Sequence, residues 1–239
     1  MGYTAKDWLA YGDQPNPSTR EKMILLAIEE IIELGPADFN TNRVCDRLDI
    51  KHPMVNHYFG NRDGLIAEAT WWVYQHWAAG VDAIMHSAMK NPRKRLEKFI
   101  RSEIAFSKRM GGMLLLLHYP ISSKGSQEIV DRTYGDQMQR YFQYHLALLA
   151  VTVRDIRSGK VTPLDFDLTN FPTTELLATP SIVFAASQIS WMTHGVAMWS
   201  SGHHLGSDKM DNPAISKLTT AIALDEYIKL ILKVAEKEV

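Results

Sequence analysis

The fold is decided by residues 41–59, TNRVCDRLDIKHPMVNHYF, in which two short apolar patterns flank a polar turn. In the first pattern Thr41 is placed to cap a helix. The inward-facing side chains of that helix recur at helical spacing and are Val44, Cys45 and Leu48. In the second pattern Pro53 can occupy the first turn of a helix, where its missing N–H leaves no bond unmade. The sequence therefore predicts two short helices, at 41–48 and 52–59.

The turn between these helices needs a residue that tolerates a positive φ. Asp49 occupies that position, and Asp adopts this conformation at lower cost than most non-glycine residues. On the second helix Val55, Tyr58 and Phe59 can lie near the core, which leaves a polar outer face. The residues of that face are Lys51, His52, Met54, Asn56 and His57. Such a pair of helices is typical of the helix-turn-helix arrangement, whose second helix fits the major groove of DNA.

A longer helix precedes this pair. STRE at 18–21 matches a capping box, in which the Ser18 hydroxyl accepts from the Glu21 amide and the Glu21 carboxylate returns to Ser18. The apolar residues behind it recur at helical spacing and are Ile24, Ala27, Ile28, Ile31 and Ile32. Gly35 and Pro36 end the pattern. We expect a helix over 18–34, the first of a three-helix domain.

The remainder of the chain carries longer helical patterns, several of which begin with a capping residue followed by proline. The expected helices are 64–89, 92–110, 126–156, one after Pro180 and one after Pro213. A long connection lies between the 126–156 pattern and the one after Pro180, at 157–178. No segment alternates as strands in hairpins do. The chain is therefore predicted to be all-α, with an N-terminal arm and helix-turn-helix domain over 1–65 and a larger helical bundle over 66–239.

Composition excludes several classes of protein. The net charge of −1 predicts no global attraction to nucleic acid or to an anionic membrane, and residues 1–65 are more acidic than basic. The single cysteine, Cys45, excludes an intramolecular disulfide framework, and we interpret it as core packing in preference to a redox sensor.

Residues 176–207 lack charge, but polar residues and Pro180 interrupt them, so we expect a helix buried among other helices in preference to a membrane span. Since no signal peptide is visible, we expect a cytoplasmic protein without a membrane partner.

The segment STREKMILLAIEEIIELG at 18–35, continued by NTNRVCDRLDIKHPMVNHYFGNRDGL at 40–65, resembles the N-terminal domain of the tetracycline-repressor (TetR) family of transcriptional regulators. The resemblance rests on the capped second helix, the aromatic end of the third helix and the short basic entry to the fourth. Three positions depart from the family pattern. Asp49 replaces its turn glycine, Asn56 its recognition-helix tyrosine, and Gly60 a frequent lysine.

The resemblance implies a set of DNA-facing residues. They are Thr41, Asn42, Arg43, His52, Pro53, Met54, Asn56, His57 and Arg62. Lys51 joins them on charge and position, and the Tyr58 hydroxyl can reach a phosphate. For Arg43 and Arg62 the alternative is a solvated surface charge, and for Met54 simple helix surface. No third ligand stands at a spacing that would make His52 and His57 a metal site, so we expect no metal and no cofactor.

The resemblance also implies that the larger bundle binds a small effector and forms a homodimer. We expect the dimer contact in segments 180–200 and 213–237, where small residues permit close helix approach; packing within one chain is the alternative. The candidate effector-binding residues are bulky and polar-tipped, and ordinary core is the alternative for each. They are Trp72, Trp77, Met110, Met113, His118, Tyr119, Met138, Tyr141, Trp191 and His194. Aromatic side chains with few polar groups favour a small, largely apolar effector.

These observations predict a dimeric DNA-binding transcriptional regulator, a repressor released from a palindromic operator in double-stranded DNA by its effector. The alternative is a helical ligand-binding and dimerisation module without sequence-specific DNA binding, favoured by the acidic balance of residues 1–65 and by Asn56 and Gly60. We expect no enzyme, because the sequence lacks HExxH, a phosphate-binding glycine loop and GxSxG. The identity of the effector, the operator sequence, the genes regulated and the choice between repression and activation lie beyond the sequence.

Overall fold

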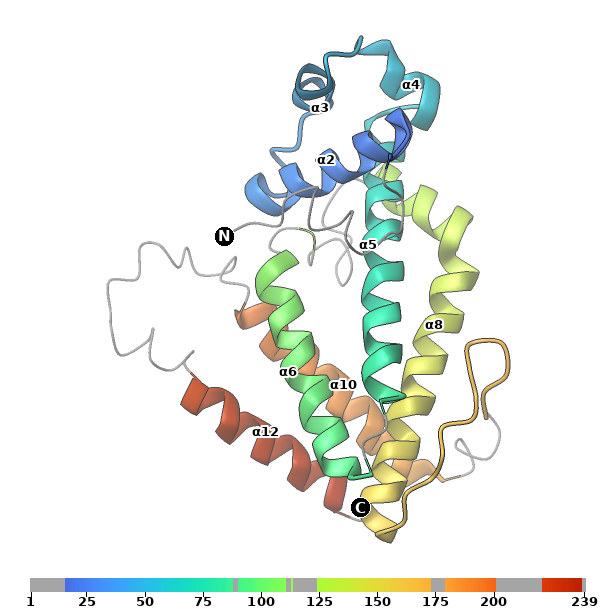
Figure 1. Ribbon diagram of the computed structural model, residues 1–239, viewed down its shortest axis with the longest axis vertical. Coiled ribbons are helices and arrows are strands. Elements are labelled where there is room, and N and C mark those ends of the chain that lie inside the picture. Colours follow the sequence, from blue (N-terminus) through green and yellow to red (C-terminus); the bar gives the residue numbers. More distant parts are fainter. Residues whose placement is uncertain are drawn as a thin grey trace. The chain divides into compact units, whose positions relative to one another are not determined.

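The computed structural model describes residues 16–87, 90–110, 113, 124–172, 179–200 and 221–237. These residues are all-α, as the sequence predicted, and the β-type pairing among them is one isolated bridge between Asp167 and Asn170 (Figure 1). The helices are α2 (Thr19–Leu34), α3 (Thr41–Leu48), α4 (Pro53–Phe59), α5 (Arg62–Met85), α6 (Pro92–Met110), α8 (Lys124–Ser158), α10 (Pro180–Ser200) and α12 (Ala221–Glu236). The expected helices 64–89 and 126–156 thus correspond to α5 and α8. The start of the last expected helix, at 213–220, lies outside the described residues.

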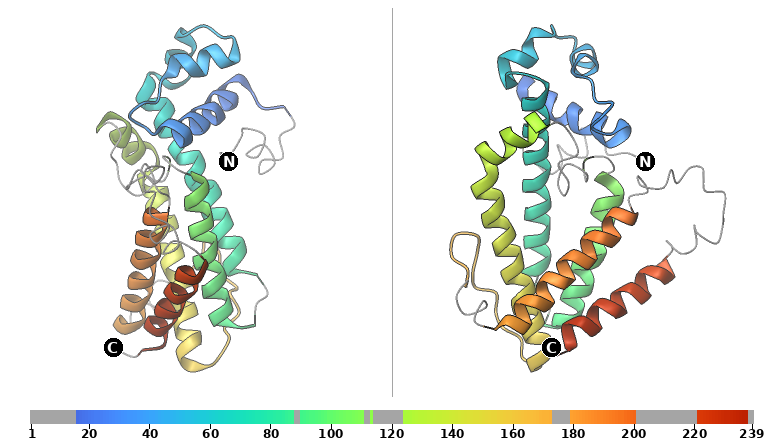
Figure 2. Two further views of the ribbon diagram at one scale, coloured as in Figure 1. Left: turned by 90° about the vertical axis from the view of Figure 1, so that its left-hand side faces the viewer. Right: turned by 180° about the vertical axis from the view of Figure 1, so that it is seen from behind.

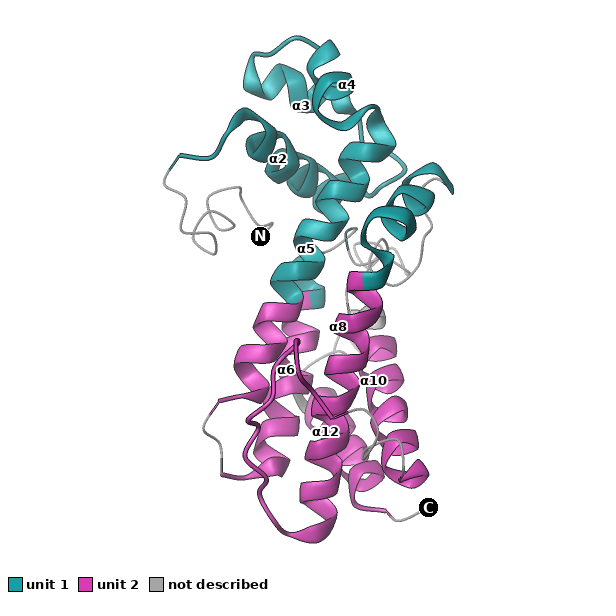
Figure 3. Ribbon diagram, turned by 90° about the vertical axis from the view of Figure 1, so that its right-hand side faces the viewer, with its two compact units in different colours: residues 1–77, 107–136 teal, residues 78–106, 137–239 magenta. Residues whose placement is uncertain are grey.

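The chain divides into two compact units (Figure 3). Unit 1 comprises residues 1–77 and 107–136, and unit 2 comprises residues 78–106 and 137–239. Helices α5 and α8 each contribute residues to both units. Unit 1 contains α2, α3 and α4, whereas α10 and α12 belong to unit 2.

Helix α2 begins with the predicted capping box. The Ser18 Oγ accepts a hydrogen bond from the Glu21 amide at 3.3 Å, and the Ser18 amide donates to Glu21 Oε2 at 2.7 Å. These bonds satisfy amides that have no partner within the helix. The helix ends at Gly35, whose φ of +82° is favourable only for a residue without a side chain.

The expected cap of α3 was wrong by one residue. Asn40, not Thr41, is the N-cap, and its Oδ1 accepts from the Asn42 amide at 2.9 Å. The short amide side chain reaches back to the first free N–H groups, as asparagine does well at this position. Thr41 instead begins the helix.

The turn between α3 and α4 has the predicted conformation. Asp49 has φ 52° and ψ 46° and is the one non-glycine residue with positive φ in the described part of the chain. Its amide donates to the Asp46 carbonyl at 3.2 Å, and the Ile50 amide donates to the Cys45 carbonyl at 3.1 Å. This left-handed cap terminates α3 sharply enough for a second helix to begin at Pro53.

The junction between α4 and α5 depends on glycine. Helix α4 ends at Gly60, with φ 77°, and the Asn61 Oδ1 accepts from the Gly64 amide at 2.9 Å at the start of α5. A Cβ on Gly64 would overlap the carbonyl oxygen of Phe59 and lie 3.0 Å from its carbonyl carbon. Gly64 therefore permits an approach of the two helices that no other residue allows.

The core of unit 1 is formed by α2 together with the inward faces of α3, α4 and α5. Its buried apolar residues include Met23, Ile28, Ile31, Phe39, Val44, Cys45, Val55, Leu65 and Ile66. Cys45 is completely buried, consistent with core packing. Helix α3 is also joined to α2 by two ion pairs, Arg43 to Glu30 and Arg47 to Glu29, the latter at 2.7 Å. Much of the charge of α3 is thereby matched within the unit.

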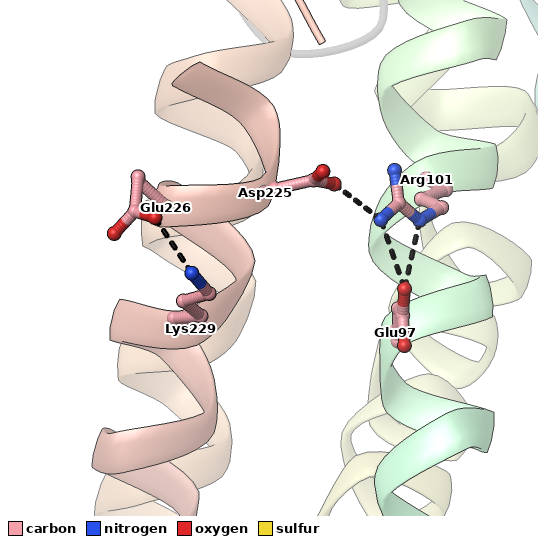
Figure 4. Close-up of polar contacts among 5 residues, drawn as sticks. All are labelled: Glu97, Arg101, Asp225, Glu226 and Lys229. Atoms are coloured by element: carbon pink, nitrogen blue, oxygen red, sulfur yellow. Dashed lines mark hydrogen bonds and ion pairs between the residues drawn. The ribbon is translucent and has the colours of Figure 1, made fainter. Parts of the chain in front are cut away.

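In unit 2, α10 and α12 lie side by side (Figure 2). Helix α12 is also attached to α6 by ion pairs at both of its ends. Arg93 contacts Glu236 at 2.6 Å. Figure 4 shows the other pair, in which Arg101 contacts Asp225 at 2.5 Å. Arg93 near the start of α6 pairs with the end of α12, whereas Arg101, farther along α6, pairs with the start of α12, so the two helices run antiparallel. Helix α10 carries no Asp, Glu, Lys or Arg, but no helix among the described residues is long and apolar enough to cross a membrane.

Candidate nucleic-acid interface

Helix α4 turns a polar face to solvent. Lys51, His52, Asn56 and His57 are exposed, as their positions in the sequence predicted, and Pro53 is exposed as well. Met54 and Tyr58, by contrast, are half-buried, and only part of each side chain is available to a partner. Val55 is 5% exposed and anchors the opposite face of the helix in the core. The exposed groups can donate and accept hydrogen bonds, which is the chemistry needed to read base edges.

Helix α3 contributes Thr41, which is half-buried, and Asn42, which is exposed. Arg43 is exposed in part, but its guanidinium is engaged within the unit. Its Nε donates to Glu30, which is 5% exposed, and its Nη2 donates to the Asp38 carbonyl at 2.5 Å. A buried carboxylate needs a partner of this kind, so Arg43 has a structural role whether or not it meets a phosphate.

Arg62 is engaged in a similar way. Its Nη2 donates to the Pro36 carbonyl at 2.7 Å and its Nε to the Phe39 carbonyl at 3.3 Å. The guanidinium carbon also lies 5.4 Å from the centroid of the Phe39 ring. Arg62 thus links the α2–α3 connection to the start of α5. The sequence had suggested either a DNA contact or a solvated charge for Arg62, and this structural role is neither of the two.

His52 has a carboxylate neighbour. Its Nε2 lies 3.3 Å from Asp46 Oδ1, and both side chains are largely exposed. The contact orients the imidazole at the start of α4, where the side chain makes no capping bond. Within the described residues no group of three or more His, Cys, Asp or Glu side chains is placed to hold a metal ion.

The candidate effector-binding residues are distributed over both units. In unit 1, Met110 and Met113 are buried, and Trp72 and Trp77 are half-buried. In unit 2, Met138, Tyr141 and His194 are half-buried. His118 and Tyr119 lie outside the described residues. Trp191 differs from the rest, because it is 68% exposed on the surface of α10.

Sequence reasoning missed two buried polar residues beside His194. Glu103 is 3% exposed, and its Oε2 lies 3.9 Å from His194 Nε2; His145 is 7% exposed. Burial lowers the pKa of both histidines to about 4, since a charged imidazole loses its hydration there. Glu103 could have been found from the sequence, because it falls on the apolar stripe of α6 with Phe99, Ile100 and Ile104. A carboxylate in that register is unusual enough to indicate a polar site.

An all-α chain that presents a short polar helix after a left-handed turn belongs to the helix-turn-helix class. Over 84 residues the chain is 26% identical to HTH-type transcriptional regulator BetI 1 of Chromohalobacter salexigens. The match takes in 35% of this chain and 42% of that protein, so the chain covers less than half the length of this curated relative. It confirms the resemblance to TetR-type regulators noted from the sequence.

Among solved structures, the chain is similar to a TetR variant from Acinetobacter baumannii AYE in complex with minocycline. The TM-score is 0.47 and the identity 14%, over 91% of this chain and 98% of that chain. No protein-family model matches the chain.

Proposed function

We propose that this protein is a homodimeric transcriptional regulator of TetR type that reads a palindromic operator with α4 and is released from DNA by a small, largely apolar effector. The observation that carries this proposal is the exposed polar face of α4, held outward by the buried Val55. In a dimer, two such helices about 34–36 Å apart would enter successive major grooves. We assign the reading role to residues 1–65 and the effector and dimer roles to residues 66–239.

The proposed DNA contacts divide by chemistry. Asn56, His52 and His57 are exposed groups that can hydrogen-bond to base edges, whereas Lys51 is suited to a phosphate. The other proposed contacts of the interface are Thr41, Asn42, Pro53, Met54 and Tyr58. Arg43 and Arg62 make a smaller contribution in this proposal than the resemblance implies, because their guanidinium groups already bind carbonyl and carboxylate oxygens of unit 1.

A binding experiment tests the reading role. Operator sequences are selected from random DNA, and the affinity for selected and for random duplexes is measured at low and moderate salt. His52→Ala and Asn56→Ala should each reduce affinity for the selected sequence by about 1–3 kcal/mol while leaving random DNA almost unaffected. Lys51→Ala should weaken both and lower the salt dependence, because a phosphate contact carries no sequence information. Lys98→Ala, an exposed lysine of α6, is the control and should change neither.

Exposed apolar side chains support the proposed dimer. Phe184 and Trp191 on α10 and Leu230 on α12 are at least 49% exposed. The two helices lie side by side, so the same helices of a second copy could complete a four-helix contact around these side chains.

The effector would bind where aromatic and sulfur-containing side chains meet buried polar groups. Tyr141, Met138 and His194 in unit 2 carry this part of the proposal, and Glu103 and His145 add hydrogen-bonding groups that the sequence had not indicated. Release requires the effector to bind more tightly to the state that does not read DNA than to the state that does.

A second function is favoured by two observations. Two of the arginines expected at DNA are bonded within unit 1, and residues 1–65 are more acidic than basic. A ligand-binding dimer without sequence-specific DNA binding would fit a surface with so few available cations. Retained dimers and ligand binding, with no sequence-selective DNA complex at any salt concentration, would favour this second function.

A further inference from the structure

Three side chains from three helices meet beside the end of α4, and this group lies outside the proposed DNA surface. Glu68 of α5 binds a different partner with each carboxylate oxygen. Its Oε2 lies 2.8 Å from Arg20 Nη2 of α2, and its Oε1 accepts from the Tyr134 hydroxyl of α8 at 2.7 Å. Glu68 and Tyr134 are both half-buried.

Arg20 connects this pair of bonds to α4. Its guanidinium carbon lies 5.2 Å from the centroid of the Phe59 ring, and Phe59 is the last residue of α4. A guanidinium that is held over a ring by a carboxylate restricts the position of that ring. The carbonyl group of Phe59 also packs against Gly64 of α5. Neighbouring helices therefore contact both the side chain and the backbone of Phe59.

Tyr134 is itself held in place. Its ring stacks on Trp71 of α5, with centroids 4.7 Å apart and planes at 7°, and Trp71 is buried. Burial and the bond to Glu68 raise the pKa of the Tyr134 hydroxyl, so it remains a donor at every physiological pH. Tyr134 lies at the eleventh residue of α8, a helix that continues to Ser158 in unit 2.

We propose that Tyr134, Glu68 and Arg20 form a positioning relay that sets the orientation of α4 according to the position of α8. The inference rests on the proposed function, because it concerns how the reading helix is controlled. None of the three residues need touch DNA: Tyr134 fixes the Glu68 carboxylate, Glu68 fixes the guanidinium of Arg20, and Arg20 fixes the ring of Phe59. A movement of α8 that breaks the bond from Tyr134 to Glu68 releases the end of α4.

The test is amide hydrogen exchange of residues 54–60 in the full chain without DNA. Tyr134→Phe removes only the hydroxyl and retains the stack on Trp71. Loss of one hydrogen bond to a carboxylate should raise exchange in α4 by about tenfold, with no change in α10 or α12. Glu68→Gln, which removes the charge that holds Arg20, should give the same local increase. Tyr144→Phe is the matched control, because it removes a hydroxyl from the same helix that donates to Asp82 in unit 2 and not to Glu68.

Affinity for the selected operator, measured on the same variants, should fall by about tenfold for Tyr134→Phe and remain unchanged for Tyr144→Phe. Unchanged exchange in α4, an equal increase in every helix, or undiminished operator affinity would each overturn the relay. If the wild-type protein selects no DNA sequence, the proposed function fails, and the exchange measurement alone still decides whether the relay positions α4.

Discussion

At the scale of single residues, the described part of the helix-turn-helix depends on a few residues that fix the path of the backbone. Asp49 supplies a left-handed turn, Gly64 a close approach, and Arg62 a bond to two carbonyl oxygens of the α2–α3 connection. Each of these roles can be separated from DNA binding, since stability can be measured without DNA.

The contact of Gly64 with the Phe59 carbonyl predicts a position-specific loss of stability. Gly64→Ala should lower the free energy of unfolding by about 1–3 kcal/mol, because the added methyl group must displace backbone. Gly80→Ala, on the same helix with no atom near the new methyl group, should leave stability unchanged or raise it by up to about 1 kcal/mol. Denaturant unfolding measures both, and equal effects at the two glycines would contradict the close approach.

The bonds of Arg62 predict that charge alone does not replace it. Arg62→Lys should reduce the free energy of unfolding by about 1–2 kcal/mol, because an ammonium group cannot bind two carbonyl oxygens in the geometry of a guanidinium. The same change at Arg132, an exposed residue of α8, should stay within about 0.5 kcal/mol. An Arg62→Lys variant of full stability but weakened DNA binding would show that the residue serves the phosphate backbone instead.

At the scale of the elements, the features that could be predicted from the sequence are those that depend on residues close together in the chain. The capping box at Ser18, the positive φ of Asp49 and the start of α4 at Pro53 were all predicted, because each depends on residues within a few positions. The cap of α3 was misplaced because Asn40 and Thr41 are both good caps and only the chain path decides between them. The roles of Arg62 and Gly64 could not be predicted, since each depends on where a backbone carbonyl lies after the helices have packed.

In the candidate site, too, features set by local sequence were predictable and features set by packing were not. Which side of α4 faces outward follows from its periodicity. Of the five residues predicted to face outward, Lys51, His52, Asn56 and His57 are exposed, and Met54 is half-buried. That Arg43 would be bound to Glu30 required the packing of α3 on α2, which no local pattern contains. The candidate effector residues were chosen by side-chain type and by their place on the middle helices, without knowledge of packing. For that reason they included the exposed Trp191 and omitted Glu103 and His145.

The buried imidazole of His145 on α8 predicts a loss of stability in acid. Its pKa in the folded protein is lowered to about 4, so the unfolded chain takes up a proton as pH falls below about 6.5 while the folded chain does not. The stabilisation is therefore complete above that pH and is lost progressively toward pH 4, by about 3 kcal/mol in total.

His145→Gln, which does not titrate, should flatten the dependence of unfolding free energy on pH over this interval. His57→Gln, the same change at an exposed histidine, should leave that dependence as it is in the wild-type protein. Chemical denaturation at several pH values between 4 and 7.5 makes the comparison. An unaltered pH slope in the His145 variant would rule out this source of acid sensitivity.

At the scale of the whole molecule, the proposed regulator requires two copies of the chain, and exposed apolar surface predicts where they meet. Trp191→Glu should convert a dimer into a monomer, because it places a charge where an indole would be covered. Phe142→Glu, at a phenylalanine of α8 that is 49% exposed, is the control and should leave the mass unchanged. Sedimentation equilibrium distinguishes the two, and a wild-type protein that is monomeric at all concentrations would exclude the dimer.

The junction after α4 also has a consequence for distant homologues. Because the Phe59 carbonyl lies where a Cβ at Gly64 would be, a chain with this junction is more stable with glycine than with another residue at the third position of the following helix. A glycine in this register therefore marks the point where the preceding helix ends, whatever exposed residues that helix carries.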